Sequence, residues 1–195
     1  MTISQEILTQ FTDWMESAKA HEAIRDYDAV NLATSDATGR LSSRIVLLRE
    51  FDARGFVFFT NYNGRKSLDL AVHSKAAMNL YWEPLMRQIR IEGVVEKVDA
   101  AQSDAYFASR SRGSQIGAWA SNQSEKMTDR AELEGRLKEY EQKFDGEDVP
   151  RPPHWGGWRL VPDMVEFWQE GDFRLHQRDV WQLKGDKWNK MLLNP

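Results

Sequence analysis

The sequence predicts a single α+β domain built on a mostly antiparallel β-barrel. Three observations support this class. Most apolar segments alternate with period two and are joined by short turns, which is the pattern of a β-meander. Segments with helical spacing are few and stand at the ends and margins of these strands. The chain of 195 residues is long enough to bury one sizeable core.

The first half of the chain is predicted to begin with a helix and to continue as strands. Residues 5–19 place apolar side chains on one helical face, and Thr2 with Gln5 is the expected capping box. The elements expected next are strands at 30–35, 42–50 and 56–60, a helix from Asn61 or Asn63 to about Ser74, and strands at 76–82 and 87–98.

The second half of the chain is predicted to carry the remaining helices and the closing strands. Asp99 with Gln102 caps a helix over about 100–110, a polar loop with glycines covers 113–124, and a charged helix covers 128–144. The elements expected after these are an irregular connector at 145–153, strands at 158–162 and 164–168, a strand-like stretch up to Arg178, the segment 179–183 and a final strand at 188–193.

No domain linker or internal repeat interrupts the chain. We therefore expect one domain over 1–195, divided into an N-terminal helix region (1–25), the first barrel strands (30–98), a helical insertion (99–150) and the C-terminal barrel strands (155–195).

Composition excludes several classes of function. The chain has no cysteine and only four, widely separated histidines, which excludes disulfides and thiolate sites and argues against a metal site. A net charge of -4 argues against general nucleic-acid binding. Glycine-rich nucleotide loops are absent, so a bound phosphate would have to be held largely by side chains. With no signal peptide or membrane span in the sequence, we expect a cytoplasmic protein.

Two positively charged side chains stand where a helix already carries positive charge. Arg65 and Lys66 fall in the first turn of the helix expected before Ser74, and the helix dipole disfavours cations there. A bound phosphate would resolve the conflict, because the free backbone N–H groups would bind it together with both side chains. The alternative is an exposed pair that the fold tolerates.

Further cationic groups suggest a second anion site. Arg44 and Arg49 stand at the two ends of an apolar strand, which predicts that both guanidinium groups point into a site. Tyr106 and Arg110 lie four residues apart on one helical face, with Ser114 just beyond. Taken alone, the Tyr106 and Arg110 pair could equally be an ordinary surface pair.

The stretch 166–178 carries a third group. Within one strand Arg174, His176 and Arg178 would share a face, with Trp168 shortly before them. Two fixed cations and an imidazole suit a planar, anionic ligand. A charged edge strand with a solvated histidine explains the stretch alone equally well.

A series of motifs in order gives the chain a specific resemblance to the pyridoxamine 5'-phosphate oxidase family. That family has an FMN-binding split β-barrel and forms homodimers with flavin sites at the subunit interface. The motifs are Arg44-Ile-Val-Leu-Leu, Phe59-Thr-Asn, Arg65-Lys66, Arg87-Gln-Ile-Arg-Ile-Glu-Gly93, Tyr106-Phe-Ala-Ser-Arg110, Ser114-Gln-Ile-Gly-Ala-Trp119, Gln123-Ser124, Pro150-Arg-Pro-Pro-His-Trp-Gly-Gly157, Glu166-Phe-Trp168 and Arg174-Leu-His176.

The resemblance implies a role for each matching position. Arg65 and Lys66 would hold the FMN phosphate, and Arg174 and His176 would be the catalytic residues over the substrate ring, with Leu175 between them. The substrate phosphate would bind Arg49, Tyr106, Arg110 and Ser114. The other positions that the resemblance assigns to FMN are Arg44, Ile45, Val46, Leu47, Leu48, Phe59, Thr60, Gln88, Gln123, Ser124, Trp168 and Arg178.

The activity implied is oxidation of pyridoxamine or pyridoxine 5'-phosphate to pyridoxal 5'-phosphate, with O₂ as acceptor and H₂O₂ as product. The chain departs from the family pattern in several places. Arg49 stands where Lys is usual, Phe59 where Tyr is common, and Gln177 where Asp is usual. Ser111 replaces a Pro, Leu192 an Arg, and the N-terminal extension that closes over the substrate in many members is nearly absent.

Two alternatives to this activity remain open. A related flavin oxidase would act on another aromatic ring and would have no use for the second phosphate site. A non-catalytic protein would carry FMN or pyridoxal 5'-phosphate as a store or a sensor, an option that the change at Gln177 keeps open.

Overall fold

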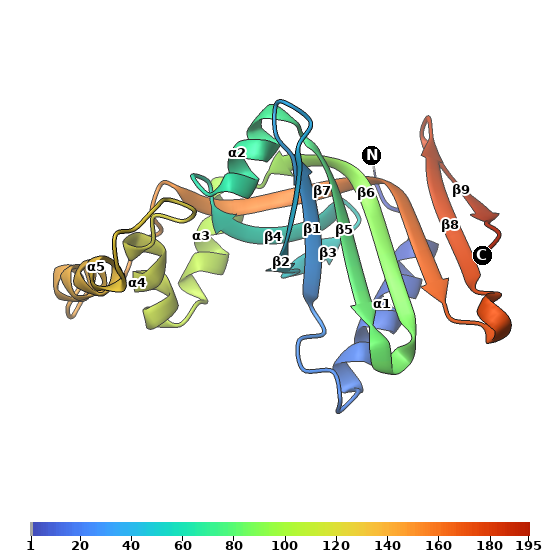
Figure 1. Ribbon diagram of the computed structural model, residues 1–195, viewed down its shortest axis with the longest axis horizontal. Helices are drawn as coiled ribbons and strands as arrows, with labels where there is room; N and C mark the ends of the chain where they lie inside the picture. The colour runs from blue at the N-terminus through green and yellow to red at the C-terminus, as the bar shows by residue number, and fades with distance from the viewer. Residues whose placement is uncertain (1) are drawn as a thin grey trace.

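The computed structural model describes residues 2–195 and folds them into one curled sheet flanked by helices (Figure 1). Every strand pairing among these residues is antiparallel. The predicted α+β class with a mostly antiparallel split β-barrel is therefore confirmed. The elements are α1 (Gln5–Ala20), β1 (Ala29–Ser35), β2 (Leu41–Leu47), β3 (Glu50–Asp52), β4 (Gly55–Asn61), α2 (Arg65–Val72), β5 (Lys75–Trp82), the 3₁₀ turn η1 (Glu83–Leu85), β6 (Arg87–Lys97), α3 (Ala100–Ala108), α4 (Arg112–Ala120), α5 (Arg130–Lys143), β7 (Trp155–Gln169), the 3₁₀ turn η2 (Asp172–Arg174), β8 (Gln177–Lys184) and β9 (Lys187–Leu192).

Strand β7 is the central strand of the sheet and pairs with β4, β6 and β8. The strand order is β2-β1-β5-β6-β7-β4-β3, and β8 pairs with the other half of β7 and carries β9. Because β7 is 15 residues long, it reaches from the helices α3 and α4 at one end of the molecule to the β8–β9 hairpin at the other (Figure 1). The two expected strands at 158–162 and 164–168 are thus one strand. Pro162 lies inside it, opposite a register shift between Glu92 and Gly93 that accommodates the missing N–H.

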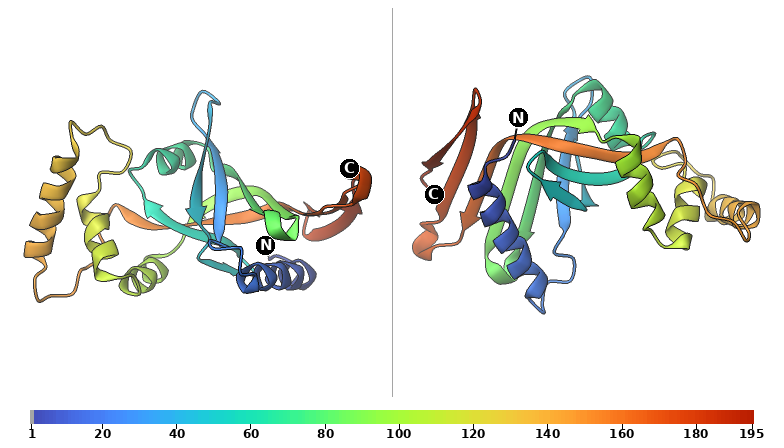
Figure 2. Two further views of the ribbon diagram at one scale, coloured as in Figure 1. Left: turned by 60° about the horizontal axis from the view of Figure 1, so that its bottom comes forward. Right: turned by 180° about the vertical axis from the view of Figure 1, so that it is seen from behind.

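Helix α1 covers the main core. Ile7, Phe11 and Met15 are buried against the sheet, as their helical spacing predicts, and Figure 2 shows the helix lying across it. The expected capping box at Thr2 is wrong. The N-cap is Ser4, whose hydroxyl accepts from the backbone N–H of Ile7, because Ser4 is the residue directly before the first helical turn. By contrast, Asp99 does accept from the N–H of Gln102, as predicted.

Residues 112–120 correct the expected loop at 113–124, because they form helix α4. Ile116, Ala118 and Ala120 are buried, and two of them pack in a second core with Phe107 and Trp155. Tertiary packing of this face outweighs the poor helix propensity of the glycines that suggested a loop.

The expected strand over 42–50 is also interrupted. The backbone N–H of Leu48 donates to Asp28 at 2.8 Å, whereas the N–H of Arg49 donates to Val57 at 2.9 Å. The chain therefore changes partners from the β1 side to β4 at this point. Leu48 turns into the core, and Arg49 is left at the corner between the two strands.

Candidate functional site

A cavity of about 840 Å³ lies between the strands β2 and β4 and the helices α3 and α4. Most of the residues predicted to bind phosphate or flavin meet there, although they come from distant parts of the sequence. Sequence reasoning missed Asn61, Ser109, Ser111, Gly117, Ala118, Ser121 and Trp155, largely because α4 was expected to be a loop. The predicted residues that line the cavity are Arg44, Ile45, Val46, Leu47, Arg49, Phe59, Thr60, Lys66, Tyr106, Arg110, Ser114 and Gln123.

Lys66 marks one end of the cavity, at the first turn of α2. Its Nζ donates to Gln123 Oε1 at 2.6 Å and to Thr60 Oγ1 at 3.0 Å. Burial lowers the pKa of Lys66 to about 8, and the nearby charge of Arg44 acts in the same direction. A partly buried cation bound only by neutral groups is well placed to pair with an anion.

The N-terminus of α2 lies beside Lys66, at the same end of the cavity. The N-cap is Gly64, not Asn61 or Asn63 as expected, and it has no side chain with which to cap the helix. Ser124 instead reaches across to accept from the backbone N–H of Arg65 at 3.1 Å. Arg65 and Ser124 therefore stand beside Lys66 but are not part of the cavity wall.

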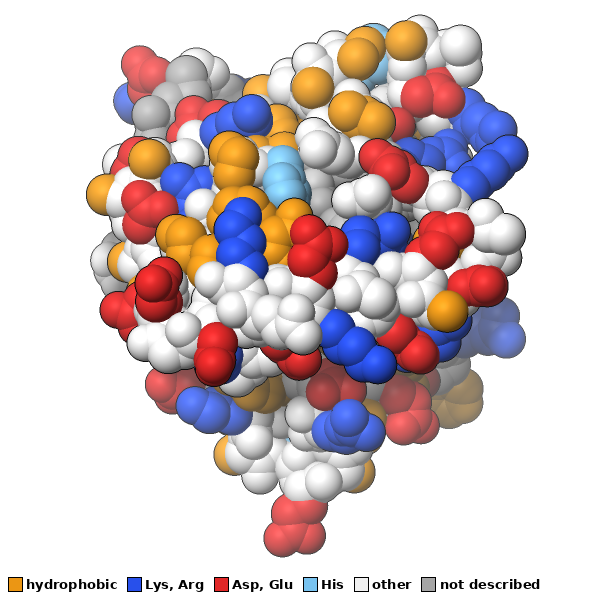
Figure 3. All heavy atoms as spheres, turned by 90° about the vertical axis from the view of Figure 1, so that its left-hand side faces the viewer, with side chains coloured by type: hydrophobic (Ala, Val, Ile, Leu, Met, Phe, Trp, Pro, Cys, Tyr) orange, Lys and Arg blue, Asp and Glu red, His pale blue; other side chains and the backbone are white. Residues whose placement is uncertain are grey.

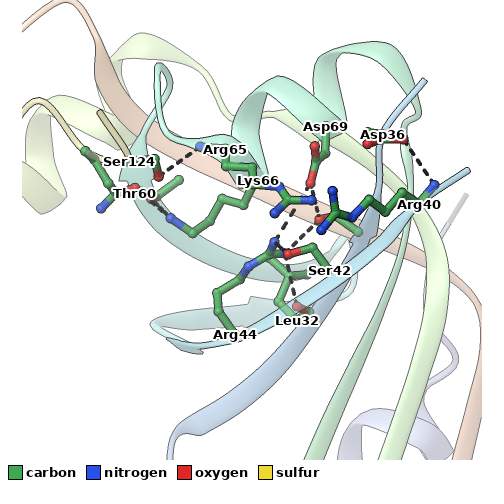
Figure 4. Close-up of polar contacts among 12 residues, drawn as sticks. Leu32, Asp36, Arg40, Ser42, Arg44, Thr60, Arg65, Lys66, Asp69 and Ser124 are labelled. Atoms are coloured by element: carbon green, nitrogen blue, oxygen red, sulfur yellow. Dashed lines mark hydrogen bonds and ion pairs between the residues drawn. The ribbon is translucent and has the colours of Figure 1, made fainter. Parts of the chain in front are cut away.

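Arg44 completes this end from strand β2. Its guanidinium donates to Thr34 Oγ1 and to Ser42 Oγ, both at 2.7 Å, and lies 3.8 Å from Asp69 Oδ2. Burial lowers the pKa of Arg44 below its usual value, although Asp69 opposes the shift. In Figure 4 the side chains of Arg40 and Arg65 also extend toward Asp69. Asp69, which is buried and accepts from Thr34, thus balances part of the positive charge, a role that sequence reasoning missed.

Arg110 lies at the other end of the cavity, just after α3. Among residues 2–195 its buried Nη1 atom finds no hydrogen-bond partner, and its guanidinium carbon lies 4.7 Å from the centre of the Trp155 ring. Burial lowers the pKa of Arg110, and the charge of Arg49 adds to the effect while Tyr106 opposes it. A desolvated arginine with a free donor is a strong anion-binding group.

Arg49 reaches the same end from the corner between β2 and β3. It forms an ion pair with Asp28 at 2.7 Å. Asp28 does not line the cavity, so it binds Arg49 on the side that faces away from the cavity.

An aromatic stack forms one wall between the two ends. The rings of Phe59 and Tyr106 are stacked with centroids 4.0 Å apart, and Trp155 continues the stack at 5.6 Å from Phe59. Phe59 packs by its ring face, so the missing tyrosine hydroxyl leaves this contact intact.

The C-terminal residues predicted for the site lie elsewhere in the same chain. Gln88, Trp168, Arg174, Leu175, His176 and Arg178 are absent from the described cavity wall, and η2 lies at the opposite end of the molecule from α3 and α4 (Figure 1). They do gather with one another. Gln88 and Arg178 flank Trp168 in the strand register, and the rings of Trp168 and His176 are 4.6 Å apart.

The expected strand face over 174–178 is wrong. Arg174 belongs to the turn η2, and strand β8 begins only at Gln177. The turn forms because Leu175 N–H donates to Asp172 O at 2.9 Å and Gly171 N–H donates to His176 Nδ1 at 3.3 Å. With Nδ1 accepting, the neutral imidazole carries its proton on Nε2.

Glu166 organises the cations of this C-terminal group. It is 2% exposed as a side chain and accepts from Arg178 Nε at 2.6 Å and from Arg90 Nη1 at 2.7 Å. The hydrogen bond that Arg178 donates to the Glu166 carboxylate raises the pKa of Arg178. Sequence reasoning missed this carboxylate, because nothing in the alternation of β7 distinguishes an acid with two arginine partners.

The described residues contain neither a cluster of metal-binding side chains nor a membrane-crossing helix. Within residues 2–195, no group of three or more His, Cys, Asp and Glu side chains is placed to hold a metal ion. Within the same range, no helix has the length and apolar content needed to cross a membrane. Acidic and basic side chains are interspersed on the end of the molecule drawn in Figure 3.

Comparison with known proteins finds matches over nearly the whole chain. Residues 17–144 match the family described as pyridoxamine 5'-phosphate oxidase, and residues 155–195 match one described as the pyridoxine 5'-phosphate oxidase C-terminal dimerisation region. A pyridoxine/pyridoxamine 5'-phosphate oxidase of Myxococcus xanthus is 49% identical over 99% of this chain and 93% of its own length. One of Cupriavidus necator is 50% identical over 99% of this chain and 91% of its own.

Among solved structures, the chain is similar to PhzG from Burkholderia lata 383, which was crystallised with tetrahydrophenazine-1-carboxylic acid. The two are 32% identical with a TM-score of 0.91, covering 97% of this chain and 92% of the other. The chain also shares its fold with a pyridoxamine 5'-phosphate oxidase-related, FMN binding protein from Nostoc punctiforme, at a TM-score of 0.73, 15% identity, and coverage of 98% and 96%.

Proposed function

Since the chain belongs to the pyridoxamine 5'-phosphate oxidase family, we propose that it oxidises pyridoxamine or pyridoxine 5'-phosphate to pyridoxal 5'-phosphate. FMN is the proposed cofactor, and O₂ is the acceptor that leaves as H₂O₂. The observation that carries the proposal is one cavity with two separate cationic ends, at Lys66 and at Arg110. Two phosphates need two such ends, one for the cofactor and one for the substrate.

The residues at the first end fit the phosphate of FMN. Lys66 and Arg44 are partly buried cations whose pKa values are lowered, so an arriving dianion would relieve the cost of their burial. The first turn of α2 supplies backbone N–H groups to the same end. When bound, FMN would supply the two-electron acceptor that the amino acids lack.

The residues at the second end fit the substrate phosphate. Arg110 offers its free Nη1 donor, Arg49 the donors not used by Asp28, and Tyr106 and Ser114 their hydroxyls. Holding a phosphate here would keep the pyridine ring beside the space between the two ends. Binding energy from this remote group would thereby serve to orient the reacting carbon.

Arg174 and His176 are proposed to act on the substrate ring from a second copy of the chain. They cannot reach the cavity of their own chain, because η2 lies at the far end of the molecule (Figure 1). The match of residues 155–195 to a dimerisation region supports a homodimer in which this segment is close to the partner. His176 would offer Nε2–H and Arg174 a fixed positive charge to polar groups of the ring.

The deciding experiment is a visible spectrum of the purified protein without oxygen. We expect the absorption bands of bound flavin, bleaching when pyridoxamine 5'-phosphate is added, and recovery with formation of H₂O₂ when air is admitted. A protein that holds FMN but is bleached by neither phosphorylated substrate would contradict the proposed reaction.

The similarity to PhzG favours one other candidate, a flavin oxidase acting on a tricyclic aromatic acid. Such a substrate carries no phosphate, so the donors at Arg110 would have no partner. Turnover of reduced phenazine carboxylates at a rate above that of pyridoxamine 5'-phosphate would favour this candidate.

A further inference from the structure

The turn that carries Arg174 and His176 has an unusual backbone. Phe173 and Arg174 are consecutive residues with positive φ angles of 57° and 65°. This left-handed conformation is costly for any residue with a side chain, and more so for a bulky one such as Phe. Strain of this kind persists where the surrounding structure enforces it and often marks a functional segment.

The turn is closed tightly enough to enforce this conformation. Leu175 N–H donates to Asp172 O at 2.9 Å, and Gly171 N–H donates to His176 Nδ1 at 3.3 Å. A Cβ atom at Gly171 would lie 2.2 Å from Leu175 O, so the chain closes at a point where only glycine fits. The backbone therefore fixes the direction in which the Cα–Cβ bond of Phe173 points.

That direction is away from the protein. Phe173 is 94% exposed and Leu175 is 70% exposed within a single chain. A large apolar ring presented to water on a strained backbone is unfavourable on both counts. Burial of the ring in an assembly would offset these unfavourable free energies.

We propose that Phe173 is an interface anchor, which inserts into a second copy of this chain at the rim of that copy's cavity. The turn lies within residues 155–195, which match a dimerisation region, so the exposed ring continues an interface that the family already uses. The inference rests on the proposed function, in which Arg174 and His176 act at the partner's cavity. Anchoring the residue just before Arg174 would hold both side chains over that cavity.

Substitution of Phe173 distinguishes a buried interface anchor from a side chain that stays in water, because the two predict changes in Tm of opposite sign. Glycine and asparagine both tolerate positive φ, so F173G and F173N relieve backbone strain and would raise Tm if the ring were in water. For an anchor, both variants instead lower Tm and raise KM for pyridoxamine 5'-phosphate about 10-fold, as expected for loss of a buried aromatic contact. F173L, which keeps apolar bulk, should stay closer to the parent protein.

Labelling gives a second readout that does not depend on catalysis. Because the chain has no cysteine, F173C and D186C each create one thiol. Asp186 lies in the exposed turn between β8 and β9 and serves as the matched control. In the FMN-loaded dimer we expect F173C to react with a maleimide at least 10-fold more slowly than D186C, and equally fast after unfolding in urea.

Two results would overturn the anchor. They are equal labelling rates for F173C and D186C in the native dimer, and a rise in Tm for F173G without a change in KM. Failure of the proposed function would look different. A parent protein that does not oxidise either phosphorylated substrate would contradict the function, while labelling and Tm would still report whether Phe173 is buried between two copies.

Discussion

Lys66 shows at the scale of one residue how burial prepares a charge for a ligand. Its hydrogen-bond partners, Thr60 and Gln123, are neutral and remain so at any pH at which the protein is folded. Burial lowers its pKa to about 8 instead of leaving it at the usual 10.5. The lysine therefore loses its proton within the pH range in which enzymes are assayed. The affinity for a phosphate group should fall as the proton is lost.

We predict that the apoprotein binds FMN more weakly as the pH rises from 7 to 9. A lowered lysine pKa means that the positive form is present below about 8 and lost above it, so affinity should fall about 10-fold by pH 9. Fluorescence quenching of FMN measures this directly, since the FMN phosphate is already a dianion over most of this range.

K66R is the matched control for this pH effect. Arginine stays protonated, so its affinity for FMN should change little between pH 7 and pH 9, and riboflavin, which has no phosphate, should show little pH dependence with either protein. The same pH dependence in K66R and in the parent protein would assign the titration to a group other than Lys66.

Arg110 is the residue that separates the two candidate reactions. We expect R110A to raise KM for pyridoxamine 5'-phosphate about 10- to 100-fold, the range of a charge-assisted hydrogen bond, and to leave FMN affinity unchanged. R130A, on the exposed start of α5, should change neither. An unaltered KM in R110A would favour a substrate without a phosphate.

At the scale of elements, Glu166 ties three strands together. Its carboxylate on β7 binds Arg90 on β6 and Arg178 on β8, and Arg90 also pairs with Glu92 at 2.6 Å. Because Glu166 is buried, its removal would leave two arginines without their shared counter-charge. These contacts also fix Arg178, which the family resemblance assigns to FMN.

We predict that E166Q lowers the free energy of unfolding by about 3 kcal/mol, as expected when one member of a buried ion pair is removed. E92Q removes the exposed partner of the same Arg90 and should cost less than about 1 kcal/mol. Urea denaturation of both variants as FMN-free proteins measures the difference. Equal losses would show that burial gives Glu166 no special weight.

At the scale of the whole molecule, the candidate site is divided between the two ends of one chain. The cavity with Lys66 and Arg110 lies beside α3 and α4, whereas Trp168, His176 and Arg178 gather near the β8–β9 hairpin (Figures 1 and 2). In a symmetric dimer each cavity would receive the C-terminal group of the partner. Complementation between defective subunits tests this division.

We predict that R110A and H176A each retain little activity alone when pyridoxamine 5'-phosphate is kept well below the KM of R110A, and that activity returns when the two are unfolded together and refolded. A mixed dimer has one site with an intact cavity and an intact C-terminal group, so random pairing should restore about a quarter of the parent activity. R110A refolded alone is the control for the procedure. Mixtures that stay as inactive as the separate variants would place all catalytic residues within one chain.

Much of this fold could be predicted because its signals are local. Alternation of apolar residues along β1, β5 and β6 specifies strands whose one face is buried, and helical spacing does the same for α1. The misplaced elements are those in which a distant contact outweighs local preference. Helix α4 forms in spite of Gly113 and Gly117 because its apolar face packs in the second core.

In the candidate site, too, some features follow from local sequence and others from distant contacts. By itself the sequence determined the fold class, predicted the two cationic groups at Lys66 and Arg110, and carried the resemblance that relates them to FMN and a phosphorylated substrate. Only the tertiary structure decided that Asp69 and Glu166 supply the counter-charges, and that the C-terminal group lies far from the cavity of its own chain. Periodicity and motifs are set by neighbours along the chain, whereas an ion pair or a shared site depends on which distant strands the fold brings together.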